Sequence, residues 1–170
     1  NEEMLNIAKK TVKDITFKKA NMITLNLNKK FDVITCLFSS IGYVKTYSNS
    51  KKTFKNFARH LKIGGVVIIS PWLTKSDCNV GFVDLCIYDD KNLKIARLSF
   101  PKIKGNISIF EMQYLVAEKN KGIKHFVDKH ELGLFEVNKT LEIMKKAGFK
   151  SKYLKNGTKN KGGTYLGIKE

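Results

Sequence analysis

Residues 31–37 read FDVITCL and residues 64–69 read GGVVII. Both are short apolar runs rich in β-branched side chains, which is typical of buried strands in a parallel sheet. Residues 49–62, between them, carry apolar side chains at helical spacing, namely Phe54, Phe57, Ala58 and Leu61. A strand, a helix and a strand in close succession form a βαβ unit, so this stretch predicts a parallel sheet with helices on its faces.

The flanking sequence predicts further elements of both kinds. Residues 2–12 predict an amphipathic helix capped by Asn1, and residues 15–17 predict a short strand. After Pro71 the pattern changes to extended segments separated by turn-like residues, at 81–89, 92–100, 106–118 and 122–130. A last helix is expected at 136–147, and two closing strands at 150–155 and 163–169.

These elements predict an α/β fold with an inserted antiparallel β meander. Residues 1–80 are expected to form part of the α/β core, 81–130 the insertion, and 131–170 the last helix and closing strands of the core. No apolar run approaches the roughly 18 residues that a membrane span requires, so no membrane partner is expected.

The composition of the 170-residue chain narrows the class of protein. An apolar share of 42% and an aromatic share of 11% argue against disorder. The three cysteines lack C-x-x-C spacing, so we expect reduced thiols in a cytoplasmic protein and no metal site. A net charge of +17 favours a nucleic-acid partner, but only Arg59 and Arg97 are arginines and the lysines are spread evenly. A solvated lysine surface is therefore the preferred interpretation over a nucleic-acid groove.

Four stretches, in this order, resemble class I S-adenosylmethionine-dependent methyltransferases: 1–8, 31–43, 60–67 and 147–149. Three segments resemble the N,N-dimethyltransferases of nucleotide-linked amino sugars, the desosamine and mycaminose type, more closely. They are 36–43, Pro71-Trp72, and 122–135 with His125, Asp128 and His130. The resemblance implies a Rossmann-like core with S-adenosylmethionine as cofactor, and methyl transfer to a small-molecule amine. It implies that residues 1–80 are the C-terminal portion of the cofactor-binding core and that the insertion at 81–130 forms the acceptor side.

The same resemblance places the family's glycine-rich loop and ribose-binding acid before residue 1. The glycine-loop unit is then missing from these 170 residues, and we expect the chain to be a fragment that is inactive alone. It would expose strand edges and apolar helix faces, which favours association, so a homodimer is a further expectation.

The residues expected to bind ligands follow from the resemblance and from their places at strand ends. For the cofactor they are Asn21, Met22, Leu37, Phe38 and Ser39. For the acceptor they are Ser40, Tyr43, Trp72 and Lys161, the last beside Gly162 where relatives carry an arginine. Asn21-Met22 can equally form an ordinary turn, and Tyr43 and Trp72 can equally belong to the core.

His130 is the candidate general base. An amine must lose its proton before it attacks the methyl group, and an imidazole can accept a proton near neutral pH. A structural role at the end of the meander is an equal alternative for His130, whereas His60 and His125 are expected to be structural. The favoured function is methyl transfer to an amino sugar on a nucleotide. The alternatives are a methyltransferase acting on another small metabolite and a lysine-rich nucleic-acid-binding or RNA-modifying protein.

Overall fold

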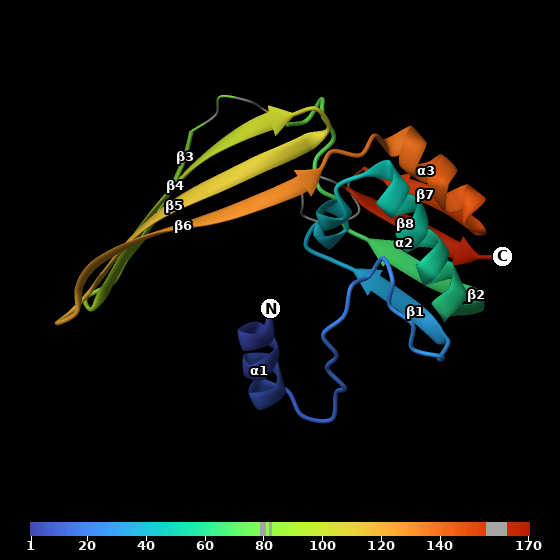
Figure 1. The fold of residues 1–170 in the computed structure, drawn as a ribbon, viewed down its shortest axis with the longest axis horizontal. Helices are drawn as coiled ribbons and strands as arrows, with labels where there is room; N and C mark the ends of the chain where they lie inside the picture. The colour runs from blue at the N-terminus through green and yellow to red at the C-terminus, as the bar shows by residue number, and fades with distance from the viewer. Residues whose placement is uncertain (79–80, 82, 156–162) are drawn as a thin grey trace.

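The structure is a computed structural model that describes residues 1–78, 81, 83–155 and 163–170. It contains two four-stranded sheets, and Figure 1 shows them as a helix-covered core and a long wing that projects from it. The predicted α/β fold with an antiparallel insertion is confirmed.

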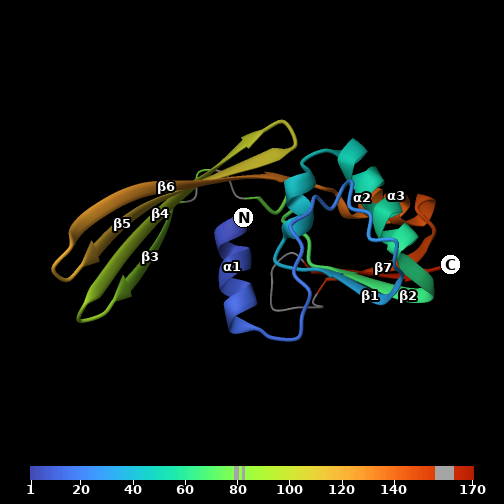
Figure 2. The ribbon, with the colours of Figure 1, turned by 60° about the horizontal axis from the view of Figure 1, so that its bottom comes forward.

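The core sheet has the strand order β1-β2-β8-β7. β1 (Phe31–Cys36) runs parallel to β2 (Leu61–Ile69), whereas β8 (Thr164–Lys169) is antiparallel both to β2 and to β7 (Phe149–Leu154). Two helices, α2 (Tyr47–His60) and α3 (Val137–Lys146), lie side by side over one face of this sheet, as Figure 2 shows. The βαβ unit expected around residues 31–69 is therefore present.

The core lies between these two helices and the sheet. Its largest members are fully buried, among them Phe54, Leu61, Ile69, Met144, Phe149 and Tyr165. The helix α2 begins where the Thr46 hydroxyl accepts a hydrogen bond from the Asn49 amide at 3.1 Å, an ordinary N-cap. Apolar residues at helical spacing in α2 and α3 thus meet apolar residues of the strands, as the pattern requires.

The wing is an antiparallel meander of β3 (Asp84–Asp89), β4 (Leu93–Lys104), β5 (Ile107–Glu118) and β6 (Gly122–Gly133). β4 and β6 extend beyond the predicted ranges of 92–100 and 122–130, whereas β5 lies within its predicted range of 106–118. β4 continues through Pro101, which is tolerated because it lies beyond the last residue that pairs with β3.

The wing meets the core where β6 passes a short 3₁₀ helix, η1 (Ser40–Val44). Glycines allow this close approach. A side chain at Gly42 would lie 2.8 Å from Leu132, and one at Gly133 would lie 2.9 Å from the Lys45 carbonyl. The junction therefore fixes the end of β6 against the segment that follows β1.

α1 (Glu2–Thr11) is the expected N-terminal helix, and the Asn1 side chain accepts from the Glu3 amide at 2.9 Å. None of its residues is buried, and it stands apart from the core sheet in both views (Figures 1 and 2). The strand predicted at 15–17 is wrong: these residues have no strand partner, and Ile15 is exposed. In the described part of the chain, no helix has the length and apolarity needed to cross a membrane.

Candidate active site

The ends of β1 and β2 form one edge of the core sheet, because parallel strands finish on the same side. The Ser70 amide donates to the Cys36 carbonyl at 2.9 Å, and this hydrogen bond holds the ends of the two strands together. Just beyond, the Ser39 hydroxyl donates to the Pro71 carbonyl at 3.1 Å. The two loops expected to hold cofactor and acceptor are therefore joined to each other.

The loop after β1 is held in an uncommon backbone conformation. Phe38 and Ser39 have φ angles of 51° and 61°, in the left-handed region. Such a conformation strains a residue that has a side chain, and it is frequent at functional sites. The Phe38 ring is 86% exposed, although a large apolar side chain is normally buried. Strain together with an exposed aromatic ring indicates a loop shaped for a ligand.

Asn21 and Met22 lie on a separate turn against α2. The Asn21 side-chain oxygen accepts from the Ile23 amide at 2.9 Å, and Asn56 donates to the Met22 carbonyl at 2.8 Å. These contacts form the ordinary turn of the alternative interpretation, and they leave one lone pair on the Asn21 oxygen. Within the described residues, no hydrogen bond joins this turn to the 37–40 loop.

A chain of hydrogen bonds runs from η1 into the wing. The Tyr43 hydroxyl lies 2.5 Å from Nδ1 of His130, and Nε2 of His130 lies 3.0 Å from a carboxylate oxygen of Asp128. Burial, and secondarily the charge of Asp128, raises the pKa of Tyr43 above its usual value. The sequence predicted Tyr43 and His130 as site residues, and the fold brings them into contact across 87 positions of sequence.

Trp72 follows β2 and packs edge-on against Phe110 of the wing, with ring centroids 6.2 Å apart. Its indole Nε1 is buried and has no hydrogen-bond partner. An unpaired buried donor costs about 1–3 kcal/mol, so it needs an explanation such as a bound ligand. The backbone end of Trp72 lies beside Gly42, because a Cβ at Gly42 would be 3.4 Å from the Cβ of Trp72.

Other predicted residues have less specific surroundings. The Ser40 hydroxyl is bonded to the Leu37 carbonyl at 2.6 Å within the same loop. Lys161 lies outside the described residues. Of the histidines expected to be structural, His60 binds the Asn56 carbonyl and the Leu27 amide, and His125 bonds to Gln113. These contacts are consistent with a structural role.

Sequence reasoning missed two features of the site. Asp128 was noted only as part of the resemblance, although the i and i+2 spacing of Asp128 and His130 on a strand places them on one face. The unpaired indole donor of Trp72 has no sequence signal, because whether a donor is paired depends on the tertiary neighbours. Both features lie at the junction between the wing and the core.

Comparisons with known proteins show which proteins this chain is similar to. Residues 1–69 match a family model described as "Methyltransferase domain". Over 167 residues the chain is 32% identical to dTDP-3-amino-3,4,6-trideoxy-alpha-D-glucopyranose N,N-dimethyltransferase of Streptomyces venezuelae, covering 98% of this chain and 70% of the relative. It is also 32% identical to dTDP-4-amino-2,3,4,6-tetradeoxy-D-glucose N,N-dimethyltransferase of Saccharopolyspora spinosa, covering 99% of this chain and 67% of the relative.

Among solved structures, DesVI of Streptomyces venezuelae superposes with a TM-score of 0.92 at 31% identity, over 100% of this chain and 72% of that chain. The sugar N-methyltransferase KedS8 of Streptoalloteichus sp. superposes with a TM-score of 0.90 at 26% identity, over 98% and 67%. The chain belongs to the class I S-adenosylmethionine-dependent methyltransferases, and within them to the family of the sugar N,N-dimethyltransferases.

The residues at the strand ends fit S-adenosylmethionine. Ser39 is half-buried, and its hydroxyl keeps its lone pairs after donating to Pro71. Leu37, which is 41% exposed, offers apolar contact in the same loop. When bound, this cofactor supplies a methyl group on a positively charged sulfur, and its transfer leaves a neutral thioether. The protein must then position the acceptor nitrogen and remove its proton.

Proposed function

We propose that the protein transfers methyl groups to the amine of a nucleotide-linked amino sugar. One observation carries the proposal: His130, already bonded to Asp128, lies beside the loops at the strand ends where the methyl donor belongs. The names of the relatives support the substrate class, since they specify dTDP-linked sugars that bear an amino group.

In this proposal Asn21, Met22, Leu37, Phe38 and Ser39 contact the cofactor. Ser40, Tyr43, Trp72 and Lys161 contact the acceptor, and the orphaned indole N–H of Trp72 donates to one of its oxygens. His130 is the final proton acceptor. These roles follow the predicted domains. Residues 1–80 and 131–170 form the core, which binds the cofactor in this proposal, and residues 81–130 form the acceptor side.

The test uses the complete gene product with S-adenosylmethionine and two acceptors, a dTDP-linked 3-amino sugar and a dTDP-linked 4-amino sugar. Mass spectrometry counts the methyl groups gained. We expect methylation of at least one of them, and none of the matched sugar that carries a hydroxyl in place of the amine. Methylation of neither amino sugar, with cofactor binding intact, would contradict the proposal and favour another small metabolite.

We also propose that nucleic acid is not a partner. Arginine is the usual reader of bases and phosphates, and both arginines already have internal partners. Arg59 donates to the Leu25 carbonyl and to Asn56, and Arg97 pairs with Asp84 at 2.8 Å. Gel-shift titration with duplex DNA and RNA should show only weak binding that disappears at physiological salt. The three cysteines are free thiols, which is consistent with a cytoplasmic enzyme.

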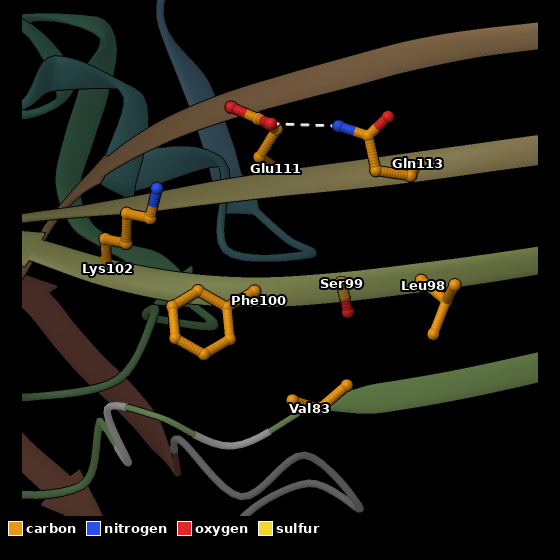
Figure 3. A pocket seen from close by; sticks show the side chains of 7 residues that line it. All are labelled: Val83, Leu98, Ser99, Phe100, Lys102, Glu111 and Gln113. Carbon is orange, nitrogen blue, oxygen red and sulfur yellow. Dashed lines mark hydrogen bonds between the residues drawn. The ribbon is translucent and has the colours of Figure 1, made fainter.

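A homodimer is proposed through the outer face of the wing, which carries apolar side chains that are all exposed: Val83, Leu85, Ile87, Leu98, Phe100, Leu115 and Val127. A hollow of about 120 Å³ lies on this surface, lined also by Lys102, Glu111 and Gln113. Figure 3 shows the side chains that line it. Because both charge signs are present, two copies related by a two-fold axis can pair them reciprocally.

Light scattering tests the dimer with Leu98→Lys, which places a charge in the apolar face, and with Ile63→Lys as the control. Ile63 is 83% exposed on β2, away from the wing. We expect a dimer for the unchanged protein and the control, and a monomer for Leu98→Lys. A monomer in every case would exclude this interface.

A further inference from the structure

The hydrogen bonds that join Tyr43, His130 and Asp128 indicate the order in which a proton can pass between them. Asp128 and His130 are two positions apart on β6 and so lie on one face of the wing. Tyr43 comes from η1, directly after the loop at the end of β1. The three side chains therefore connect the methyl-donor side of the site to the wing.

The carboxylate of Asp128 determines which nitrogen of His130 carries the hydrogen. An ionised carboxylate only accepts hydrogen bonds, so Nε2 of His130 must donate to it. Nδ1 of the neutral ring is then unprotonated and accepts from the Tyr43 hydroxyl. Both ring nitrogens have partners, so an acceptor amine cannot reach either one without breaking a contact.

Tyr43 is more accessible than the imidazole that it contacts, since the His130 side chain is 29% exposed. Tyr43 is 48% exposed, and its oxygen keeps a lone pair after donating to His130. Its raised pKa, caused by burial and by the charge of Asp128, keeps the phenol protonated at neutral pH. The hydroxyl can therefore accept a hydrogen bond from a ligand while it donates one to the imidazole.

We propose that Tyr43 contacts the acceptor amine and relays its proton to His130, and that Asp128 is a positioning residue that sets the tautomer of His130; this rests on the proposed function. The ammonium of the acceptor gives one proton to the phenol oxygen as the phenol gives its own to Nδ1. The products of this step are a neutral amine, an unchanged phenol and an imidazolium paired with Asp128. The amine lone pair is then free to form the bond to the methyl carbon.

The charged surroundings of His130 favour this sequence. From η1 and its C-cap come Tyr43 and Lys45, and the latter pairs with Glu131 at 2.8 Å. The neighbours of His130 on β6, Lys129 and Glu131, pair with each other and lie on the opposite face of the strand. From β5, Phe110 faces His130 and contributes no charge. Among the described contacts, Asp128 is thus the one carboxylate bonded to the imidazole.

The experiment compares Tyr43→Phe, His130→Asn and the double variant in the complete enzyme with an amino-sugar nucleotide. The phenylalanine keeps the ring packed edge-on against His130 at a centroid distance of 5.9 Å and removes only the hydroxyl. We expect Tyr43→Phe to lower kcat about 10²-fold at pH 7, with KM changed less than about twofold. The double variant should fall no lower than the worse single variant, because groups that act as one unit are not additive.

The pH profile separates a relay from a structural contact. As pH rises toward the pKa of the amine, more acceptor arrives without its extra proton, so the deficit of Tyr43→Phe should shrink. Asp128→Asn should show the same profile with a smaller deficit, and it provides a second measurement if Tyr43→Phe folds poorly. Tyr88→Phe, on the far part of the wing, is the matched control and should retain full activity at every pH.

The relay is overturned, while the proposed function stands, if the unchanged enzyme is active and Tyr43→Phe is fully active at pH 7. It is also overturned if the deficit of Tyr43→Phe is constant with pH and matched by a lower Tm. Multiplicative losses in the double variant would also overturn it, because they indicate independent roles. Absence of turnover by the unchanged enzyme with every amino-sugar nucleotide is a different outcome, and it overturns the proposed function itself.

Discussion

Gly42→Ala tests whether the junction between η1 and β6 sets the geometry of the site. A Cβ at this position would lie 2.8 Å from Cδ2 of Leu132 and 3.2 Å from its Cβ, whereas ordinary contact begins at 3.4 Å. Leu132 is 5% exposed and has little room to move. The junction must therefore open by up to 0.6 Å, the difference between 3.4 and 2.8 Å, or Leu132 must leave its rotamer.

The expected magnitude combines two effects. Overpacking a buried contact costs about 1–3 kcal/mol, and each kcal/mol lowers the Tm of a chain of this size by about 2–4 °C. Tyr43 adjoins Gly42, and His130 lies two residues before Leu132 on β6, so the same opening lengthens their 2.5 Å hydrogen bond. Because a displacement of about 1 Å can cost about 10²-fold in rate, we expect about a tenfold loss of kcat at neutral pH.

The assay measures Tm by differential scanning fluorimetry and initial rates for Gly42→Ala, Leu132→Val and the double variant. Valine removes the Cδ2 atom that the new methyl group meets, so the double variant should recover part of both losses. Without a steric conflict, alanine would stabilise a helical position by about 0.5–1 kcal/mol relative to glycine. A Gly42→Ala enzyme with unchanged or raised Tm and full turnover would refute the reasoning.

Three further predictions concern separate parts of the chain. Met144→Ala should destabilise the enzyme by about 2–5 kcal/mol in denaturant titrations, because this fully buried side chain packs between α3 and the core sheet. Phe38→Gly should leave the Tm within about 2 °C, since glycine adopts the left-handed conformation freely, but should weaken cofactor binding in calorimetry. Lys45 holds the pKa of Glu131 below its usual value, so this pair stabilises the fold above the unfolded pKa and loses that effect as pH falls through the folded pKa. The Tm of Glu131→Gln should accordingly lie below that of the unchanged enzyme at pH 7, and the two should converge in melts at pH values below the folded pKa of Glu131.

The fold could be predicted wherever the hydrophobic periodicity and the turn or capping residues indicated the same element. The parallel strands at 31–37 and 64–69, the helix between them and the four-strand meander all appear, with boundaries shifted by a few residues. The strand at 15–17 failed because a strand requires a partner, and local β propensity does not reveal whether one is adjacent. β4 extends to Lys104 through Pro101, although a proline normally interrupts a strand. The sequence could not show that this is possible, because it depends on the pairing of β3 with β4 stopping at Ser99.

The site was predictable where it depends on strand ends and less so where it depends on contacts between distant segments. The loop after β1 could be located from its place in the βαβ unit. The pairing of Tyr43 with His130 could not, because it depends on how the wing docks against η1, and that docking depends on Gly42 and Gly133 fitting against their neighbours. At Asn21 the ambiguity is local, because the side-chain oxygen accepts a hydrogen bond from the Ile23 amide within a turn. A loop sequence alone does not distinguish such a turn from a ligand contact.

In the site that we propose, two requirements of methyl transfer fall on different parts of the chain. The donor side is formed by the ends of β1 and β2, whose positions are set by the buried core and cannot shift without disturbing it. In this proposal the proton-accepting side is carried by β6, on a sheet whose described contacts with the core lie at one end. Changes along the wing can therefore alter which acceptor fits without moving the donor loops, provided that the junction at Gly42 and Leu132 is kept. That junction is the place where a single added methyl group should affect both stability and turnover.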